Sequence, residues 1–172
     1  MTRAAIAIAC ALALAACGGA QNKVEQANST HEYPSPRPPT PTVSGGSRDA
    51  IAAIRSFATS YINWTADTVS AQMNQLAAQS IGQARSAMQL AAGQTAGDYE
   101  LQRGGIANSG TVEAIAPLGA HHDQYVVVTR ELTTATNTTA YEGLRPAWHV
   151  ALATVVQLTG GRWVLSRWQP EN

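Results

Sequence analysis

The sequence lacks the charge and the motifs that nucleic-acid binding and the commonest kinds of catalysis require. Its 11 lysines and arginines are matched by 11 aspartates and glutamates, so the formal net charge is zero. Nucleic-acid-binding proteins usually carry a basic excess that neutralises phosphates, and this balance argues against that class of partner. The chain also has no phosphate-binding loop, no nucleophile elbow and no pair of histidines at zinc-binding spacing.

Long hydrophobic runs are missing as well. Met1-Thr2-Arg3 is followed by residues 4–16, a stretch of Ala, Ile and Leu that is interrupted only by Cys10. A membrane-spanning helix needs about 20 apolar residues, and this run is shorter. One positive charge before a short apolar run is typical of a secretory signal peptide. We therefore expect residues 1–16 to be an export signal that is removed.

The second of the two cysteines directly follows this run, in Leu14-Ala15-Ala16-Cys17, which resembles the lipobox of bacterial lipoproteins. The resemblance implies cleavage before Cys17, acylation of its thiol, and a lipid-anchored domain on the extracytoplasmic face of a cell membrane, periplasmic or at the cell surface. Each buried methylene contributes about 0.8 kcal/mol, so two or three acyl chains hold a domain on a bilayer. The alternative is an ordinary small-residue cleavage site. Cys10 is discarded with the peptide, so the mature monomer can form neither a disulfide nor a thiolate metal site.

Between the signal and the domain the composition shifts to Gln, Asn, Ser, Thr and Pro. Such a segment buries too little apolar surface to offset the entropy of ordering it. Within it, residues 34–41 (PSPRPPTP) favour polyproline II. We expect residues 17–47 to be the lipidated cysteine and a disordered, proline-rich stalk. Residues 48–170 are long enough for one domain with its own core and too short for two.

The first part of the domain shows helical periodicity. Ser47 can cap a first helix, whose apolar face recurs every three or four residues: Ile51, Ile54, Phe57, Ala58, Tyr61 and Ile62. A second helix is expected to begin near Thr65 or Asp67, both able to cap it. A third is expected to run from Ser80 to a stop at Gly93.

After Gly97 the pattern changes to that of β-strands. Weak alternation covers residues 99–103 and 111–118, residues 124–132 are rich in β-branched side chains, and residues 147–158 alternate throughout. Gly160-Gly161 then predicts a two-residue turn into a last strand over residues 162–168. With that turn, Leu158 faces Trp163, Val156 faces Leu165 and Ala153 faces Trp168.

This register divides the closing hairpin into two faces. The face expected to lie against the helices carries Trp148, Val150, Leu152, Val156, Leu158, Trp163 and Leu165. The opposite face carries Trp168, Val164 and His149, and it is apolar for a surface that faces solvent. It is therefore a candidate interface with a second copy of the chain or with another protein. The alternative is a sheet covered on both sides.

Helices followed by a run of strands predict an α+β domain with N-terminal helices packed on a curved antiparallel sheet of four or five strands. In this layout residues 48–169 resemble nuclear-transport-factor-like (cystatin-like α+β cone) domains. The carriers are residues 56–61 (SFATSY) with Trp64, the strand 125–131, and the hairpin 160–168 (GGRWVLSRW). The order of export signal, stalk and domain is similar to the periplasmic domains of type IV secretion and conjugation scaffold subunits.

Few residues point to chemistry. His121-His122-Asp123 are adjacent in a turn, where side chains point apart, so a solvated turn is favoured over a metal site. His149 is expected to be a hydrogen-bonded structural residue rather than a catalytic base. No metal or other cofactor is expected. The family that the domain resembles includes isomerases and dehydratases, which use a carboxylate and a tyrosine in a pocket. The resemblance makes Asp67, Asp98, Tyr61 and Tyr99 the candidates for these roles.

Two functions follow as alternatives. The favoured one is a non-enzymatic module that binds a partner protein or copies of itself, linked to a conjugation or secretion apparatus. The other is a cone that binds or converts a small apolar molecule. The interior of the cone distinguishes them, because side chains that fill it favour the module, whereas a cavity of about 300 Å³ or more with a buried carboxylate favours a ligand site.

Overall fold

In a computed structural model, which describes residues 42–171, the first helix begins directly after Asp49. The Asp49 side chain accepts a hydrogen bond from the backbone N–H of Ala52 at 2.7 Å, which is the usual chemistry of a helix N-cap. The expected cap, Ser47, lies two residues too early. Its hydroxyl accepts a hydrogen bond from the Asp49 backbone instead, at 3.3 Å.

In the described part of the chain the four α-helices come first, with the short strand β1 between α1 and α2, and the four long strands follow. In chain order they are α1 (Ala50–Ile62), β1 (Trp64–Thr65), α2 (Val69–Ala78), α3 (Gly82–Thr95), α4 (Tyr99–Gly104), β2 (Ile106–Pro117), β3 (Gln124–Ala135), the 3-10 turn η1 (Thr139–Tyr141), β4 (Ala147–Gln157) and β5 (Trp163–Glu171). The five strands form one antiparallel sheet in the order β1-β2-β3-β4-β5. This confirms the predicted α+β class with N-terminal helices on a curved antiparallel sheet.

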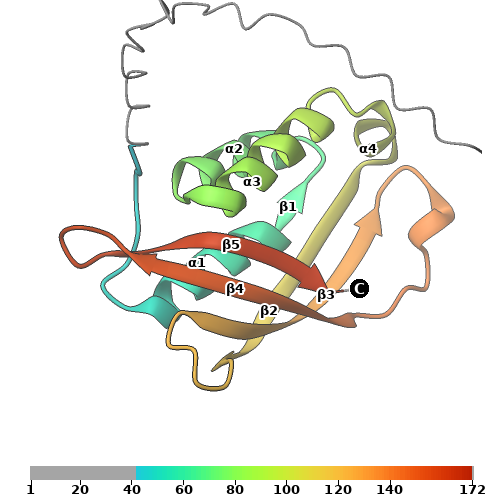
Figure 1. Cartoon of the computed structure of the whole chain (residues 1–172). Coiled ribbons are helices and arrows are strands. Elements are labelled where there is room, and N and C mark those ends of the chain that lie inside the picture. Colours follow the sequence, from blue (N-terminus) through green and yellow to red (C-terminus); the bar gives the residue numbers. More distant parts are fainter. Residues whose placement is uncertain (1–41, 172) are drawn as a thin grey trace, which may run out of the picture. The chain divides into compact units, whose positions relative to one another are not determined.

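The helices cover the inner side of this sheet. Figure 1 shows the strands as a curled sheet, with α2 and α3 lying over β5. α1 contacts β2, β4 and β5, α3 packs on β5, and α2 packs on α3. The shared core includes Ile54 and Phe57 from α1, Leu76 from α2, Met88 from α3 and Val127 from β3. None of the helices within residues 42–171 has both the length and the hydrophobicity that crossing a bilayer demands.

One predicted strand is wrong. Residues 99–103 were expected to be extended, but they belong to the helix α4. The Asp98 carboxylate caps it by accepting hydrogen bonds from the backbone of Glu100 at 3.0 Å and Leu101 at 3.1 Å. Gly105 then ends it with φ of 58°, a left-handed conformation that glycine adopts without a Cβ penalty. A local cap and a local stop therefore outweigh a weak alternation of apolar residues.

The closing hairpin has the predicted register over only part of its length. Ala153 pairs with Trp168 as expected. Between Thr154 and Val155 the register shifts, so that Trp163 pairs with Gln157 instead of Leu158. Ser166 is the extra residue of this bulge. A bulge inserts one residue into one strand and cannot be deduced from turn length alone.

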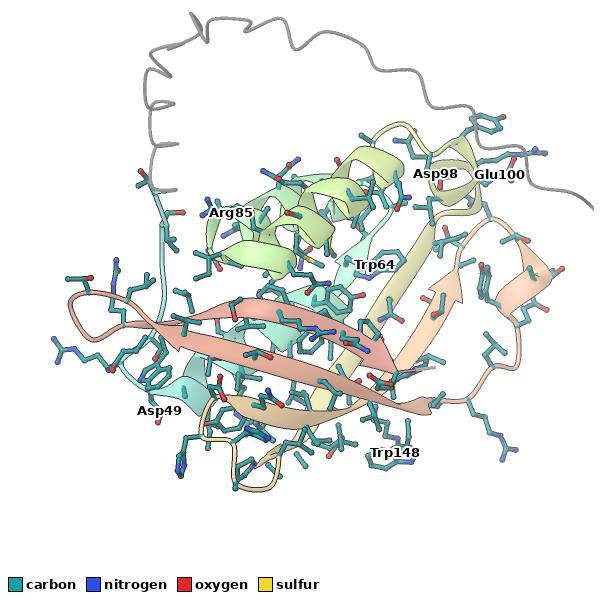
Figure 2. The ribbon with its side chains drawn as sticks, viewed as in Figure 1. Asp49, Trp64, Arg85, Asp98, Glu100 and Trp148 are labelled. Carbon is teal, nitrogen blue, oxygen red and sulfur yellow. The ribbon has the colours of Figure 1, made fainter. Side chains whose placement is uncertain are left out.

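The predicted faces are reversed on β4 and at Trp168, whereas Leu165 and Trp163 lie against the helices as predicted. The residues buried against the helices are Ala151, Ala153, Val155, Leu165 and Trp168, whereas Trp148 is 63% exposed and Val150 and Val156 are each 39% exposed. Figure 2 shows Trp148 on the side of the sheet away from the helices, and Trp64 on the helix side. Trp163 is half-buried and packs against the core.

The physical reason for this reversal is the space between α1 and the sheet. Helix α1 contacts β4 directly, and alanines at positions 151 and 153 leave room for that approach. The core volume is supplied by large side chains of the helix, such as Phe57, and by Trp168 from β5. Because interiors are close-packed, small residues on one surface are matched by large residues on the other. The largest residues of β4 therefore need not face the core.

Candidate functional site

On the concave side of the sheet lies a cavity of about 480 Å³ that is open to solvent. Its walls come from α1, β1, α2 and α3 on one side and from β2, β3 and β4 on the other. Most of the lining is aromatic, aliphatic or small, with a few polar groups: Tyr61, Trp64, Val69, Met73, Ala91, Thr95, Asn108, Glu131, Thr133, Leu144, Arg145, Ala147 and His149. A concave, mostly apolar space with a few polar groups is typical of a small-molecule site.

Strand register gathers the polar groups on one face. In β3, alternate residues point to the same side, so Thr129, Glu131 and Thr133 share the inner face with Val127. Asn108 of β2 pairs with Thr133. His149 of β4 pairs with Thr129.

Glu131 lies at the centre of a hydrogen-bond network. Its Oε2 accepts a hydrogen bond from Asn108 Nδ2 at 2.8 Å, and its Oε1 accepts one from the Thr129 hydroxyl at 2.5 Å. Asn108 also donates to the Ile62 carbonyl at 2.7 Å and accepts from the Thr133 hydroxyl at 3.1 Å. Since each partner is itself held in place, the carboxylate has a fixed position on the cavity wall.

Tyr61 connects this network to the aromatic core. Its ring lies 5.3 Å from that of Trp168 and 6.4 Å from that of Phe57, measured between centroids. Burial raises the pKa of the Tyr61 hydroxyl above its ordinary value of 10.0, the Trp168 indole N–H opposes this rise, and the Glu131 carboxylate adds to it. Tyr61 therefore keeps its proton at neutral pH, when it can act as a hydrogen-bond donor.

A second, smaller recess adjoins the same residues. It has a volume of about 160 Å³, and Tyr61, Glu131 and His149 line both this recess and the larger cavity. Trp168 also lines the recess. Its indole nitrogen approaches the Tyr61 hydroxyl, but within residues 42–171 it has no partner that meets hydrogen-bond geometry. Glu131 is thus reached from two hollows.

The structure separates the candidate pocket residues. Tyr61 lines the cavity. Asp67 lies exposed between β1 and α2, Tyr99 is 66% exposed on α4, and neither lines the cavity. Tyr99 instead lies beneath the Arg103 guanidinium, 5.8 Å from it. Asp98 caps α4, so the carboxylate on the cavity wall is Glu131 rather than any of the acids expected.

The candidate interface residues are not together on an exposed surface. Trp168 is 3% exposed and Val164 1% exposed, so the expectation that they form an outer interface is wrong. Trp168 faces Phe57 and Tyr61 because its side of β5 is the inner one, and Gly46 packs closely against Val164. His149 is exposed, but at the cavity mouth.

The remaining candidates are placed as follows. His121, His122 and Asp123 are exposed in the β2–β3 connection. The described residues contain no group of three or more His, Cys, Asp or Glu side chains that could hold a metal ion. Cys17 lies outside the described residues.

Glu131, Asn108 and Trp64 were missed as site residues, although β3 carries a signal. On its inner face the apolar Val127 is followed by Thr129, Glu131 and Thr133. A face that changes from apolar to polar along one strand leaves the packed core and meets a cavity or solvent. No comparable signal marks Asn108 or Trp64.

Comparison with known proteins does not assign this chain to a family. No protein-family model matches the chain, and no curated protein sequence matches it. The resemblance to nuclear-transport-factor-like domains therefore stays a prediction beyond the shared α+β class. Function is inferred from the cavity and the residues that line it.

Proposed function

We propose that the domain binds a small, mainly apolar molecule in the cavity on the concave side of its sheet. The observation that carries this proposal is the cavity of about 480 Å³ with Glu131 on its wall. Its size falls within the range of about 300–1,000 Å³ that is usual for ligand sites. A half-buried carboxylate at such a site orients a ligand, while the apolar walls supply most of the affinity.

The walls fit this role. Trp64, Val69 and Met73 offer aromatic and aliphatic surface, and Met73 and Val69 are themselves buried in the core, which makes that wall rigid. Burial of apolar ligand surface contributes about 25 cal/mol per Å² before the costs of association. Tyr61, protonated at neutral pH, and Glu131 provide one donor and one acceptor on the same wall.

This proposal replaces the scaffold module as the favoured function. The two residues that were to carry a protein interface, Trp168 and Val164, are buried. The cavity of about 480 Å³ exceeds the size expected of a ligand site, and its carboxylate, Glu131, is half-buried rather than buried. A link to conjugation or secretion stays a prediction from the order of signal, stalk and domain.

Filling the cavity should abolish binding. Ala91 of α3 lines the cavity, and its replacement by tryptophan places a large side chain in the space that a ligand needs. We expect the purified full chain to bind 2-naphthylmethanol saturably in a ligand-observed NMR titration. Ala91→Trp should weaken this binding at least tenfold, which corresponds to about 1.4 kcal/mol.

The control uses the neighbouring position on the same helix. Leu90 is 63% exposed and does not line the cavity, so Leu90→Trp adds the same side chain on the solvent side. Its affinity for the probe should equal that of the unaltered chain. Equal binding by Ala91→Trp would place the probe elsewhere, and no saturable binding to the unaltered chain would overturn the proposal.

The lipid anchor is a separate part of the proposed function. From the lipobox-like Leu14-Ala15-Ala16-Cys17, we expect the protein purified from bacterial membranes to begin at an acylated Cys17. Intact-mass spectrometry would detect the loss of residues 1–16 and the added lipid. Cys17→Ala should abolish the lipid mass. An unmodified N-terminus at any other residue would contradict the anchor.

A further inference from the structure

We infer that the ligand of this cavity carries a protonated amine that binds to Glu131, an inference that rests on the proposed ligand-binding function. Glu131 is half-buried on the cavity wall. Ligands of the same apolar shape are therefore discriminated by the charge of their polar group, with cations preferred over neutral and anionic molecules.

The first observation is the way in which the carboxylate is held. Asn108 donates to one oxygen at 2.8 Å and Thr129 donates to the other at 2.5 Å. Both partners are neutral, so neither balances a negative charge. Both contacts are donated to Glu131 and use only part of its acceptor capacity. About four acceptor sites belong to such a group, and these two contacts leave capacity for the N–H donors of an ammonium ion.

The second observation is the surroundings of that charge. A half-buried charge is less well solvated than one in water, and an opposite charge brought next to it interacts more strongly than it would on an open surface. The Tyr61 pKa, raised by burial and further by Glu131, reflects the same low solvation and negative potential. The negative potential of Glu131 disfavours deprotonation of Tyr61, and a cationic group on the ligand would compensate that potential.

The third observation is the aromatic lining. Tyr61 and Trp64 both line the cavity that contains Glu131, and Figure 2 shows Trp64 on the helix side of the sheet. Aromatic faces attract cations by about 0.5–2 kcal/mol, depending on how far the site is desolvated. Met73 and Val69 are left to contact the apolar body of the ligand.

The other charged or titratable groups of the lining lie at the mouth. Arg145, in the connection that precedes β4, and His149 of β4 are both exposed. An anionic ligand would use Arg145, and this is the alternative that a test must separate. Arg145 is in water and screened, whereas Glu131 is half-buried, so the stronger selection is expected from Glu131.

Three probes with one apolar body test the inference in the full chain at neutral pH. They are 2-naphthylmethylamine, which is protonated, 2-naphthylmethanol, which is neutral, and 2-naphthoate, which is anionic. We expect the amine to bind at least tenfold more tightly than the alcohol, and the naphthoate to bind most weakly. Isothermal titration calorimetry gives the three dissociation constants.

Glu131→Gln should remove the preference for the amine, because it deletes the charge and keeps one acceptor oxygen. Its affinity for the amine should fall to about that for the alcohol, and far-ultraviolet circular dichroism of the variant would show that the fold persists. Glu113→Gln is the matched control, since Glu113 is exposed on β2 and does not line the cavity. That variant should keep the preference.

Each outcome decides a different point. If no probe binds, the proposed ligand site fails. If the alcohol and the amine bind equally well to the unaltered chain, the ligand site stands and the amine inference fails, whether or not Glu131→Gln folds. If naphthoate binds most tightly, the polar contact belongs to Arg145 and the amine inference is overturned. If Glu131→Gln folds and keeps the amine preference, Glu131 is not the recognition group.

Discussion

Replacing Trp168 with alanine is expected to lower the free energy of unfolding by about 3–5 kcal/mol, the usual cost of truncating a buried aromatic residue. Trp168 is 3% exposed, and its ring lies 5.3 Å from those of both Phe57 and Tyr61. The change removes contacts between α1 and β5 and leaves a void beside the recess near Glu131. Urea unfolding followed by far-ultraviolet circular dichroism would measure the loss.

Trp148 provides a control of the same residue type on the opposite face of the sheet. It is 63% exposed, and its contact with Arg130, 5.9 Å from the guanidinium carbon to the ring centroid, is on the surface. Trp148→Ala should cost no more than about 0.5–1 kcal/mol, the range of an exposed cation–π contact. A larger loss for Trp148→Ala than for Trp168→Ala would mean that the faces of the hairpin are assigned in reverse.

The second large effect is expected at Gly110, in the middle of β2. A Cβ at this position would lie 2.7 Å from the Arg130 carbonyl oxygen and 3.2 Å from the Glu131 Cα. Both are backbone atoms of the neighbouring strand β3, so the clash could be relieved only by moving that strand. The Asn63 side chain also holds Gly110 in place, accepting from its N–H at 2.9 Å and donating to its carbonyl at 3.1 Å. Gly110 therefore cannot move away from β3 freely.

Gly110→Val should destabilise the domain by about 2–3 kcal/mol through overpacking against backbone. Strand propensity alone predicts the opposite, since valine is favoured over glycine in strands by up to about 1 kcal/mol. Because Gly110 pairs with Glu131, the change should also weaken binding of 2-naphthylmethylamine. Thermal and urea unfolding, with calorimetric titration of the probe, would measure both effects.

Ser109→Val is the matched control. Ser109 is exposed on the same strand and faces away from the cavity, so its replacement should change stability by less than about 0.5 kcal/mol. If Gly110→Val were as stable as Ser109→Val, the close approach of β2 and β3 at this point would be contradicted.

The candidate site was only partly predictable, for reasons that differ from residue to residue. Tyr61 was recognised as a pocket candidate because its place on the apolar face of a helix can be read from the sequence of that helix alone. Glu131 depends on the register that places it beside Asn108, a residue of another strand, and no spacing along the chain records that contact. Asp67 and Tyr99 have suitable chemistry, but they lie on exposed positions outside the cavity.

The sequence alone determined the α+β class and the placing of the long helices before the long strands. The change from a three-to-four residue period before Gly97 to strand patterns afterwards is a local property, which each segment carries in its own side chains. The start and stop of α4, at Asp98 and Gly105, are local in the same way, although the weak alternation concealed them.

Tertiary structure decided which face of the closing hairpin is buried and where the cavity lies. Both faces of β4 are apolar, so hydrophobicity could not choose between them. The choice was made by the close approach of α1, which requires the small Ala151 and Ala153 beneath it. The cavity lies between the helices and the part of β3 in which the inward-facing residues change from the apolar Val127 to Glu131. These are properties of packing between distant segments, which no single segment encodes.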